Sequence, residues 1–376
     1  MTTTPAPLIA LFLGNLEMGG AERVFITLAH QFMQRGCRVR LILAHKTGAL
    51  LTELDPAIEI IDLQAVRSGQ PRWLFALRTL FALRRHLRDD PPQALLSTLT
   101  GANLIAILAR ALSGQSFRLV IREAVTLPNV RSWLRLTAMR WLYPRADKVV
   151  VLTGPMREQL KDTLNLAASA MVVIGNPLNS ERIAQLVVDP TEHQRSKAHV
   201  PYWLAIGRLV LQKDFATLIE AAAELNRDGG APRIVILGDG PLRHDLETQI
   251  NRLNLKPRIV LAGFTTNPYP WLANASGYVL SSRWEGYPNV LLEALHFNLP
   301  IVATRYDDSV AELLESPPNV QHRLVPIGDP VSMANAIRSL ASTPRSGKHQ
   351  PPPGQDTAAA AVQTIVDRYL ALLLPQ

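Results

Sequence analysis

The sequence contains only one cysteine, Cys37, among 376 residues. A single cysteine excludes an intrachain disulfide framework and any metal site built from several cysteines. A chain of this length can bury enough apolar surface to be stable without such cross-links. We therefore expect ordinary hydrophobic cores, with Cys37 as a small buried residue.

The sequence also lacks an uninterrupted apolar run that could cross a membrane. A transmembrane helix needs about 20 apolar residues, whereas the most apolar stretches, 104–112 and 362–374, each contain charged side chains. Residues 1–7 carry no basic side chain ahead of a short apolar run, so they do not resemble a secretory signal. We expect no membrane span and a cytosolic protein.

Acidic residues are scarce in the N-terminal half. Residues 1–178 contain 21 Lys and Arg against 12 Asp and Glu, a net charge of +9. The rest of the chain has 18 against 19, a net charge of −1. This one-sided excess predicts an anionic partner for the first half, which could be nucleic acid, an acidic ligand or an anionic membrane surface.

The composition and the apolar pattern predict two α/β domains. Hydrophobic residues make up 47% of the chain and charged residues 19%, which is too apolar for disorder. Apolar runs alternate with helix-period segments in the first half and again in the second, so we expect two mostly parallel, doubly wound sheets. The expected strands are 8–13, 39–43, 94–97, 119–121, 149–152 and 171–174, then 202–206, 234–237, 259–262, 277–281 and 301–304.

Polar and proline-rich stretches divide the chain further. Residues 180–199 lack a strong apolar period and are expected to link the domains, and 344–356 contain a triple proline and are expected to form a mobile loop. A helix is expected over residues 357–373. The predicted segments are a first Rossmann-like domain at 1–179, the linker at 180–199, a second Rossmann-like domain at 200–343, the loop at 344–356 and the C-terminal helix at 357–376.

Two basic residues follow the first expected strand of the second domain. In an open parallel sheet, ligands bind outside the carboxyl ends of the strands. Gly207 and Arg208 lie at such an end, and Lys213 follows five residues after Arg208. An arginine fork and a lysine point charge can together hold a diphosphate. By position alone, a pair of solvated surface charges is the alternative interpretation.

The most informative motif, Glu-Gly-Tyr-Pro-Asn-Val-Leu-Leu-Glu, follows another expected strand and runs from Glu285 to Glu293. Gly286 lets the backbone come close to a ligand, and Asn289 is expected to cap a helix whose free N–H groups suit a phosphate. Glu293 would lie about one turn into that helix, where a carboxylate can accept both hydroxyls of a ribose. Glu285 would face the group attached to the phosphate.

A third loop, Gly-Asp-Gly-Pro at 238–241, invites comparison with the dinucleotide-binding fingerprint. The comparison fails because Arg243 stands where the third glycine is required. A nicotinamide-dependent oxidoreductase is therefore disfavoured. A nucleic-acid binder would explain the basic charge but gives no reason for Arg208, Glu285 and Glu293 to lie in ligand-facing loops.

Taken together, these motifs resemble those of the retaining family-4 glycosyltransferases of GT-B architecture. The resemblance also includes Gly-Gly-Ala-Glu-Arg-Val at 19–24 and Asn-Pro at 176–177. It implies two Rossmann-like domains facing a cleft, with the acceptor bound mainly by the first and a nucleotide-sugar by the second. It implies transfer of a hexose or N-acetylhexosamine, with a UDP-sugar as the first expectation, and a last helix that crosses back to the first domain.

The resemblance assigns roles to individual residues. Arg208 and Lys213 would neutralise the diphosphate, Glu285 would hold the donor sugar, and Glu293 would bind the ribose. The backbones of Val290 and Leu291 would contact phosphate, and Gly19 and Gly20 would let the first domain approach the donor. The implied catalytic set is Glu285, Arg208 and Lys213. The implied donor-binding set is Glu293, Val290, Leu291, Gly286, Asn289, Gly19, Gly20 and Gly207.

No Asp-x-Asp metal motif occurs in the sequence. Fixed cations can stabilise the negative charge on a leaving diphosphate, so we expect Arg208 and Lys213 to take the place of a metal and expect no cofactor. Two departures from the family affect the sugar site. Residues 97–103 lack the histidine that many relatives have, and 305–309 replace a small Pro/Gly-rich loop, so the choice of sugar is expected to differ.

Two features of the first half concern the acceptor. Arg122 and Glu123 follow an expected strand, and acceptor binding and a local ion pair are both open interpretations. Segments 72–88 and 131–145 combine arginine and tryptophan at helical spacing. Each could be an amphipathic helix covering the sheet, but two such segments in the acceptor domain favour contact with an anionic membrane.

We therefore expect a cytoplasmic enzyme, peripheral on the inner face of the plasma membrane, that acts in cell-surface glycan synthesis. Its acceptor would be a saccharide, with a polyprenyl-diphosphate-linked one as the first expectation, and nucleic acid would not be a partner. A soluble acceptor is one alternative. A catalytically silent nucleotide-sugar-binding scaffold of the same fold is the other.

Overall fold

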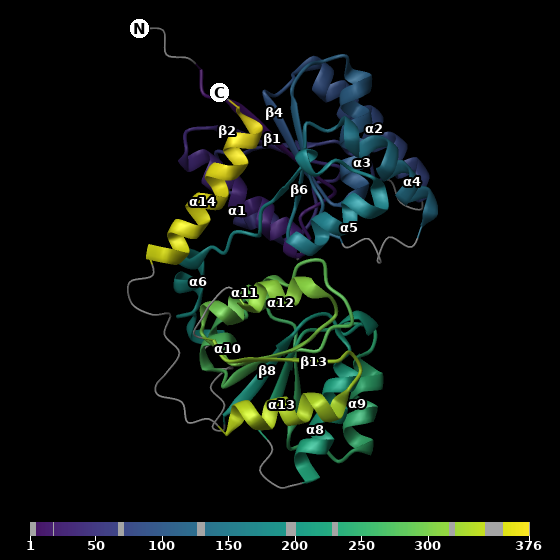
Figure 1. The fold of residues 1–376 in the computed structure, drawn as a ribbon. Coiled ribbons are helices and arrows are strands. Elements are labelled where there is room, and N and C mark those ends of the chain that lie inside the picture. Colours follow the sequence, from purple (N-terminus) through teal and green to yellow (C-terminus); the bar gives the residue numbers. More distant parts are fainter. Residues whose placement is uncertain are drawn as a thin grey trace. The chain divides into compact units, whose positions relative to one another are not determined.

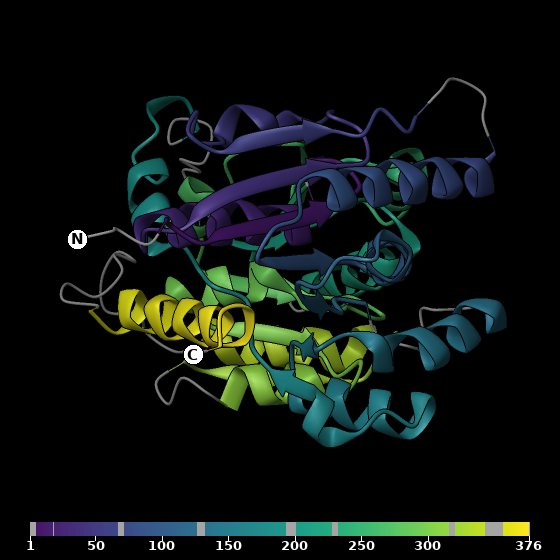
Figure 2. The same cartoon turned by 90° about the horizontal axis from the view of Figure 1, so that it is seen from above.

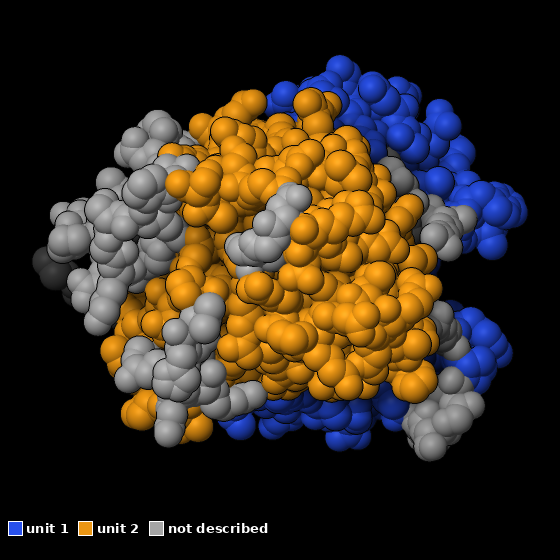
Figure 3. All heavy atoms as spheres, turned by 90° about the horizontal axis from the view of Figure 1, so that it is seen from below, with its two compact units in different colours: residues 1–177, 360–376 blue, residues 178–359 orange. Residues whose placement is uncertain are grey.

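The structure is a computed structural model of the 376-residue chain. It describes residues 5–17, 19–66, 71–125, 132–192, 201–227, 232–315, 320–342 and 356–375. The chain divides into two compact units, coloured separately in Figure 3. Unit 1 comprises residues 1–177 and 360–376, and unit 2 comprises residues 178–359.

Unit 1 is built on a seven-stranded sheet with the order β3-β2-β1-β4-β5-β6-β7. All of its described strand pairs are parallel. The strand order reverses between β1 and β4, which are neighbours in space but not in sequence. The strands are β1 (Leu8–Leu13), β2 (Arg38–Leu43), β3 (Glu59–Asp62), β4 (Ala94–Thr98), β5 (Arg118–Arg122), β6 (Lys148–Val151) and β7 (Met171–Val173).

Helices cover both faces of this sheet, as Figure 1 shows. The first and last helices of the chain, α1 and α14, share one apolar core with the sheet. The opposite face is covered by α2, α3 and α5, and α4 packs against α3 and α5. The helices are α1 (Gly20–Gln34), α2 (Arg72–Asp89), α3 (Thr100–Ser113), α4 (Trp133–Leu142), α5 (Gly154–Leu164) and α14 (Asp356–Leu373), with 3-10 turns η1 (Ala49–Glu53), η3 (Tyr143–Arg145) and η4 (Ala168–Ala170).

The helix α14 lies on unit 1 although more than 180 residues separate it from β7. Its apolar residues Val362, Val366, Tyr369 and Leu373 are buried in the core shared with α1. Polar contacts hold its C-terminal half: Arg35 pairs with Asp367, and the Arg118 guanidinium donates to the carbonyl oxygen of Leu372 at 3.1 Å.

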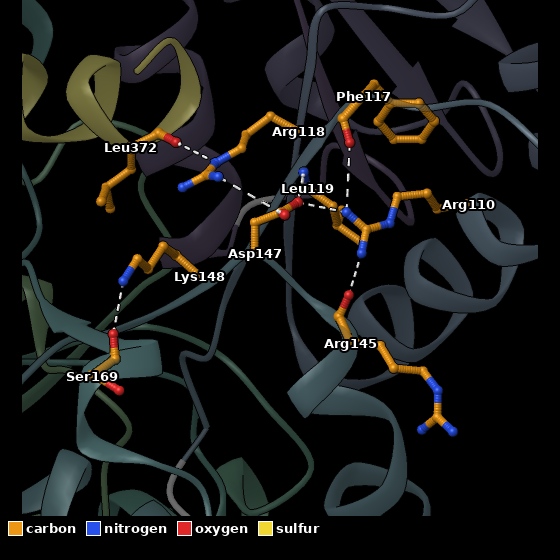
Figure 4. Close-up of polar contacts among 9 residues, drawn as sticks. All are labelled: Arg110, Phe117, Arg118, Leu119, Arg145, Asp147, Lys148, Ser169 and Leu372. Atoms are coloured by element: carbon orange, nitrogen blue, oxygen red, sulfur yellow. Dashed lines mark hydrogen bonds and ion pairs between the residues drawn. The ribbon is translucent and has the colours of Figure 1, made fainter. Parts of the chain in front are cut away.

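Asp147, just before β6, connects the neighbouring elements (Figure 4). Its carboxylate accepts the backbone N–H of Leu119 at 2.7 Å and pairs with Arg110 of α3. Arg118 lies 3.9 Å from the second carboxylate oxygen and also bonds to Leu372 of α14. One half-buried carboxylate therefore ties together β5, β6, α3 and, through Arg118, the last helix.

Unit 2 is built on a six-stranded parallel sheet with the order β10-β9-β8-β11-β12-β13. Its strands are β8 (Tyr202–Ile206), β9 (Arg233–Leu237), β10 (Ile259–Gly263), β11 (Gly277–Leu280), β12 (Ile301–Thr304) and β13 (His322–Val325). One face packs against α8, α9 and α13, and the other against α6, α10, α11 and α12. The helices are α6 (Ser180–Leu186), α8 (Phe215–Arg227), α9 (Arg243–Arg252), α10 (Tyr269–Asn274), α11 (Asn289–His296), α12 (Asp308–Glu315) and α13 (Pro330–Ala341), with the 3-10 turn η5 (Leu211–Lys213).

The two predicted doubly wound sheets are confirmed, and every expected strand is present. Two further strands, β3 and β13, were not expected. Each lies at an edge of its sheet and is only partly buried. Edge strands need no continuous apolar run, because one side faces water. Because β3 and β13 contain charged residues, they do not form the continuous apolar runs by which the other strands were predicted.

The boundary between the units differs from the predicted one. It falls between Pro177 and Leu178, and the first residues of the expected linker form α6, whose Ile183 is buried in the core of unit 2. Residues 193–199 of that linker lie outside the described residues, as do 344–355 of the expected loop. Among the described helices, none is both long and apolar enough to cross a bilayer.

Replacing Asp147 with alanine should lower the free energy of unfolding by about 1–3 kcal/mol, because the buried N–H of Leu119 and two guanidinium groups lose their acceptor. Chemical denaturation followed by circular dichroism measures the change. Asp89→Ala is the matched control, since Asp89 is exposed and surface ion pairs contribute little. Equal stability of the two variants would contradict the role given to Asp147.

Candidate functional site

The carboxyl ends of β8 and β11 bring together the two motifs of the second domain. The strands are neighbours in the sheet, so the loops that follow them meet at the same edge. Lys213 ends the 3-10 turn after β8, and Glu285 lies in the loop after β11. The Nζ atom of Lys213 donates to Oε1 of Glu285 at 2.5 Å. Two predicted site residues, 72 positions apart, therefore form a direct ion pair.

Gly207 provides the space that Lys213 occupies. A β-carbon added to Gly207 would lie 2.8 Å from Cε and 2.9 Å from Cδ of the Lys213 side chain. These distances are shorter than van der Waals contact, so any larger residue at 207 would displace the lysine stem. Glycine at this position therefore places the ammonium group next to Glu285.

The Glu285 carboxylate is held by Lys213 and by two neutral side chains. Besides Lys213, it accepts hydrogen bonds from Oγ of Ser282 at 2.6 Å and from Nε2 of Gln212 at 3.2 Å. The residue is only 7% exposed, so its orientation is fixed. The backbone oxygen of Ser282 in turn accepts a bond from Thr304 at the end of β12. Gln212 and Ser282 were not predicted, although each is close in sequence to a predicted site residue.

Arg208 presents its side chain differently. The side chain is exposed, and within the described part of the chain its guanidinium group makes no hydrogen bond or ion pair. A second arginine on this edge, Arg283, is paired with the buried Asp214 at 3.0 Å. Arg208 is therefore the cation that can accept an anionic ligand without first leaving a protein carboxylate.

The Gly-Asp-Gly-Pro loop has a structural explanation. Gly238 has a φ of +142°, and a β-carbon there would lie 1.9 Å from the carbonyl oxygen of Gly207. Gly240 is similarly close to the backbone of Leu209. These glycines let the loop after β9 pack directly on the loop that carries Arg208. Both glycines therefore have a role in packing, which agrees with the absence of a complete dinucleotide-binding fingerprint in this loop.

The helix α11 corrects one expectation. Pro288 occupies the N-cap position and Asn289 is the first helical residue, so the expectation that Asn289 caps the helix is wrong. The backbone N–H of Leu291 donates to the carbonyl oxygen of Pro288 at 2.8 Å. Glu293 lies one turn into the helix, as expected, with Oε1 3.4 Å from the hydroxyl of Tyr269.

Tyr306 and Asp307 lie in the loop after β12. Burial raises the pKa of the Tyr306 hydroxyl, and the charges of Asp307 and Glu285 raise it further. Burial also raises the pKa of Asp307, which accepts the backbone N–H of Ser309 at 2.9 Å. The segment that departs from the family pattern is therefore close enough to Glu285 to interact with it electrostatically.

The glycine motif of unit 1 surrounds the start of α1. Gly19 is the N-cap and Gly20 is the first helical residue. The Glu22 carboxylate folds back over Gly19, where an added β-carbon would lie 2.1 Å from Oε2. Burial raises the pKa of Glu22, while the charge of Arg122 acts in the opposite direction. Gly19 therefore leaves room for a half-buried carboxylate at the carboxyl edge of this sheet.

Arg122 and Glu123 do not pair with each other in the structure. The Arg122 guanidinium donates to Oγ1 of Thr98 at 2.8 Å and also bonds to Asn176. The local ion pair considered from the sequence is therefore wrong for these two residues. Arg122 instead connects β4 and β5 to the Asn-Pro segment at 176–177, where the first part of unit 1 ends.

The Glu123 carboxylate is fully buried and accepts several hydrogen bonds. Its donors are the Thr100 hydroxyl at 3.1 Å, the backbone N–H groups of Ala124 and Val125 at 3.0 and 2.9 Å, and the Tyr143 hydroxyl. Burial raises its pKa, and the hydrogen bonds from Tyr143 and Val125 oppose that shift. With its acceptor capacity used inside the protein, Glu123 supports the loops around it.

Both halves of the chain match families of known proteins. Residues 18–182 match the family described as Glycosyltransferase Family 4, and residues 200–343 match Glycosyl transferases group 1. The lipopolysaccharide core biosynthesis glycosyltransferase LpsD of Rhizobium meliloti is 30% identical over 356 residues, which cover 94% of each chain. The chain belongs to glycosyltransferase family 4.

Other relatives and solved structures agree with this family. A Campylobacter jejuni enzyme, N-acetylgalactosamine-N,N'-diacetylbacillosaminyl-diphospho-undecaprenol 4-alpha-N-acetylgalactosaminyltransferase, is 29% identical over 317 residues, covering 81% of this chain and 82% of that one. The fold is similar to that of Anabaena HepE in complex with UDP and glucose, with a TM-score of 0.79 at 21% identity over 98% and 99% of the two chains. This family-4 glycosyltransferase therefore has the GT-B fold.

Replacing Gly207 with alanine should lower the turnover of the glycosyltransferase about tenfold, equivalent to about 1.4 kcal/mol of transition-state stabilisation. The added methyl group would push Lys213 away from Glu285. The flexible lysine can move, so the unfolding temperature should change little. Steady-state kinetics and thermal denaturation test the two halves of this expectation.

The control is Gly101→Ala in unit 1, where an added β-carbon meets no atom within 4 Å. It should leave nucleotide affinity unchanged. If Gly207→Ala retains full turnover, the position of the lysine stem does not matter for the reaction.

Proposed function

We propose that this family-4 glycosyltransferase transfers a hexose or N-acetylhexosamine from a UDP-sugar to a lipid-linked saccharide, with retention of the anomeric configuration, in the synthesis of a bacterial cell-surface glycan. The observation that carries the proposal is the Lys213–Glu285 pair, 2.5 Å apart, at the strand edge that also bears the exposed Arg208. This edge offers cations for a diphosphate and, next to them, a fixed carboxylate for sugar hydroxyls.

The proposed donor site uses each charge for one part of the nucleotide-sugar. Arg208 and Lys213 bind the diphosphate, Glu293 accepts the ribose hydroxyls, and Glu285 accepts hydroxyls of the sugar. As the bond between the anomeric carbon and the diphosphate breaks, negative charge grows on the leaving oxygen. Fixed cations stabilise that charge more than reorienting water does. The same cations support our proposal that the reaction needs no metal.

The ion pair between Lys213 and Glu285 suggests how the site responds to the donor. Without a ligand, the lysine charge is balanced by Glu285. A diphosphate carries two negative charges and competes for the ammonium group, which frees one acceptor position on Oε1 of Glu285 for a sugar hydroxyl. Ser282 and Gln212 keep the carboxylate in place during this exchange. Diphosphate binding and sugar binding are therefore coupled through one lysine.

The proposals for the substrates draw on similar proteins. HepE has been solved with UDP and glucose, which supports a UDP-sugar as donor. The Campylobacter relative is named for a saccharide on diphospho-undecaprenol, which supports a polyprenyl-diphosphate-linked acceptor. We place acceptor binding in unit 1. A lipid-linked acceptor and the +9 charge of residues 1–178 both favour a peripheral position on the inner face of the plasma membrane.

A silent scaffold of the same fold would bind nucleotide-sugar but release no UDP. Incubation of a UDP-sugar with the protein and a membrane extract separates the two functions: UDP release that depends on the extract supports the transferase. Anomeric analysis of the product by NMR then tests retention.

Replacing Arg208 or Lys213 with alanine should lower turnover at least tenfold, because each removes about 1.4 kcal/mol or more of stabilisation from the leaving diphosphate. Turnover should survive a chelator. Lys256→Ala is a matched control, since Lys256 is an exposed lysine of the same unit. Full activity in Arg208→Ala and Lys213→Ala would contradict the role of these residues in binding the diphosphate. Loss of activity on chelation would contradict metal independence.

Replacing Glu293 with glutamine should weaken nucleotide binding, because the carboxylate that accepts the ribose hydroxyls loses its charge. Glu285→Gln should instead lower turnover while UDP still binds, since Glu285 acts on the sugar and its loss leaves Lys213 free for the diphosphate. Titration calorimetry with UDP, together with steady-state kinetics, separates the two effects. Equal UDP affinities in the two variants would contradict the division of roles.

A further inference from the structure

The outer face of α2 carries large apolar side chains. Trp73, Leu77 and Phe81 follow one another at every fourth position and are exposed, with Trp73 at 65% and Phe81 at 57%. Residues four apart lie on the same face of a helix. Arg85 and Arg88 continue this face toward the end of the helix and are also exposed. The face is therefore apolar at its start and basic at its end.

The helix α4 has the same combination. Trp133 is 71% exposed, Trp141 is 68% exposed, and Leu134 is also exposed. Arg135 and Arg140 lie between the two tryptophans and point to solvent as well. From the sequence, both segments could have been ordinary amphipathic helices with their aromatic residues on the sheet. The structure shows these tryptophans on the outside instead.

Exposed tryptophan is concentrated on these two helices. Three of the six tryptophans in the sequence, Trp73, Trp133 and Trp141, are exposed. In unit 2, Trp203 and Trp271 are buried in the cores and Trp284 is partly covered. Exposed aromatic surface is unfavourable in water and, when clustered, marks an interaction site.

The two helices flank α3 on one side of unit 1. Both pack against α3, and Arg84 of α2 donates to the carbonyl oxygen of Leu112 at 2.8 Å. Figures 1 and 2 show α2 and α4 on the same flank of the unit. The only acidic residue in either helix is Asp89, which lies within 4 Å of Arg85 and Arg88. We call the exposed apolar and basic side chains of these two helices the α2–α4 face: Trp73, Leu77, Phe81, Arg85, Arg88, Trp133, Leu134, Arg135, Arg140 and Trp141. This face combines tryptophan with a net excess of arginine.

We propose that the α2–α4 face docks unit 1 on an anionic phospholipid bilayer, with Trp73, Trp133 and Trp141 in the headgroup layer and the arginines on lipid phosphates. The inference rests on the proposed function for the lipid-linked acceptor. Tryptophan is favoured at membrane interfaces because its ring is apolar and its N–H is polar. Arginine adds attraction to anionic lipid within a Debye length of the surface.

Charge favours this occupant over a second copy of the chain. A symmetric dimer through the same face would bring arginines of α2 and α4 from both copies together, with Asp89 as the only acidic residue of each copy on these helices. An anionic bilayer complements every arginine on the face. Self-association and binding to RNA are the competing outcomes of the experiment.

The first experiment measures binding of the full chain to vesicles of phosphatidylcholine with and without 30% phosphatidylglycerol by co-sedimentation. We expect binding to the anionic vesicles that weakens in high salt. A Trp73→Ala, Trp133→Ala, Trp141→Ala variant should bind at least tenfold more weakly. Phe264→Ala is the matched control, since Phe264 is an exposed aromatic residue of unit 2. Binding of the triple variant equal to that of the wild type would overturn the proposal.

The second experiment isolates the charge. Replacing Arg85 and Arg88 with glutamine should weaken binding to anionic vesicles about fivefold for each arginine, the equivalent of about 1 kcal/mol each near an anionic surface. Lys256→Gln in unit 2 is the control. An unchanged affinity of the double arginine variant would overturn the role of the basic end of the face.

The third experiment needs no variant. Vesicles with brominated acyl chains quench tryptophan fluorescence on contact, so the wild-type protein should lose part of its emission when bound. Bound protein without quenching would overturn insertion of the tryptophans. A dimer in sedimentation velocity that the tryptophan substitutions dissociate, or RNA that displaces the protein from vesicles, would assign the face to another partner.

The readouts keep this proposal separate from the transferase activity. UDP affinity, measured by calorimetry, should be the same in the wild type and in all variants of the α2–α4 face, because the proposed donor site lies in unit 2. If the protein transfers no sugar but binds anionic vesicles through these tryptophans, the proposed function fails and the docking face stands. If it transfers sugar to a lipid-linked acceptor in detergent but does not bind vesicles, the docking face fails and the proposed function stands.

Discussion

Parallel strand pairing is the constraint on which the rest of this structure depends. Every described strand pair in both sheets is parallel, so each strand needs a crossover before the next and all carboxyl ends in a sheet lie at one edge. Loops that are far apart in sequence meet there. The Lys213–Glu285 pair is a direct product of this geometry, because β8 and β11 are neighbours in the sheet.

The same constraint gives different results in the two units. In unit 2, the strand edge presents the exposed Arg208 beside the Lys213–Glu285 pair, with Glu293 one turn into the helix that follows β11. In unit 1, Arg122 and Glu123 lie at the equivalent edge but are buried and hydrogen-bonded to Thr98, Asn176 and other neighbours. Buried polar groups with satisfied hydrogen bonds fix local geometry. We therefore assign a structural role to these two residues and the proposed chemistry to unit 2.

Much of the fold could be predicted because central parallel strands are buried on both faces and so form continuous apolar runs. The two strands that were not predicted, β3 and β13, are edge strands with charged residues in partly buried positions. The helix α6, at the start of the expected linker, was not predicted for a related reason. The short helix α6 contributes only Ile183 and the partly buried Leu186 to a core, and two apolar residues are too few to show a helical period in the sequence.

By itself, the sequence determined the alternation of strands and helices, the motifs around Arg208, Lys213, Glu285 and Glu293, and the family that they resemble, because these signals are local along the chain. Only the tertiary structure decided which charges pair and which side chains face water. Gln212 and Ser282 became part of the site through contacts with Glu285. The tryptophans of α2 and α4 proved to be exposed. Burial and pairing depend on what packs against a residue from distant parts of the chain, and local spacing does not contain that information.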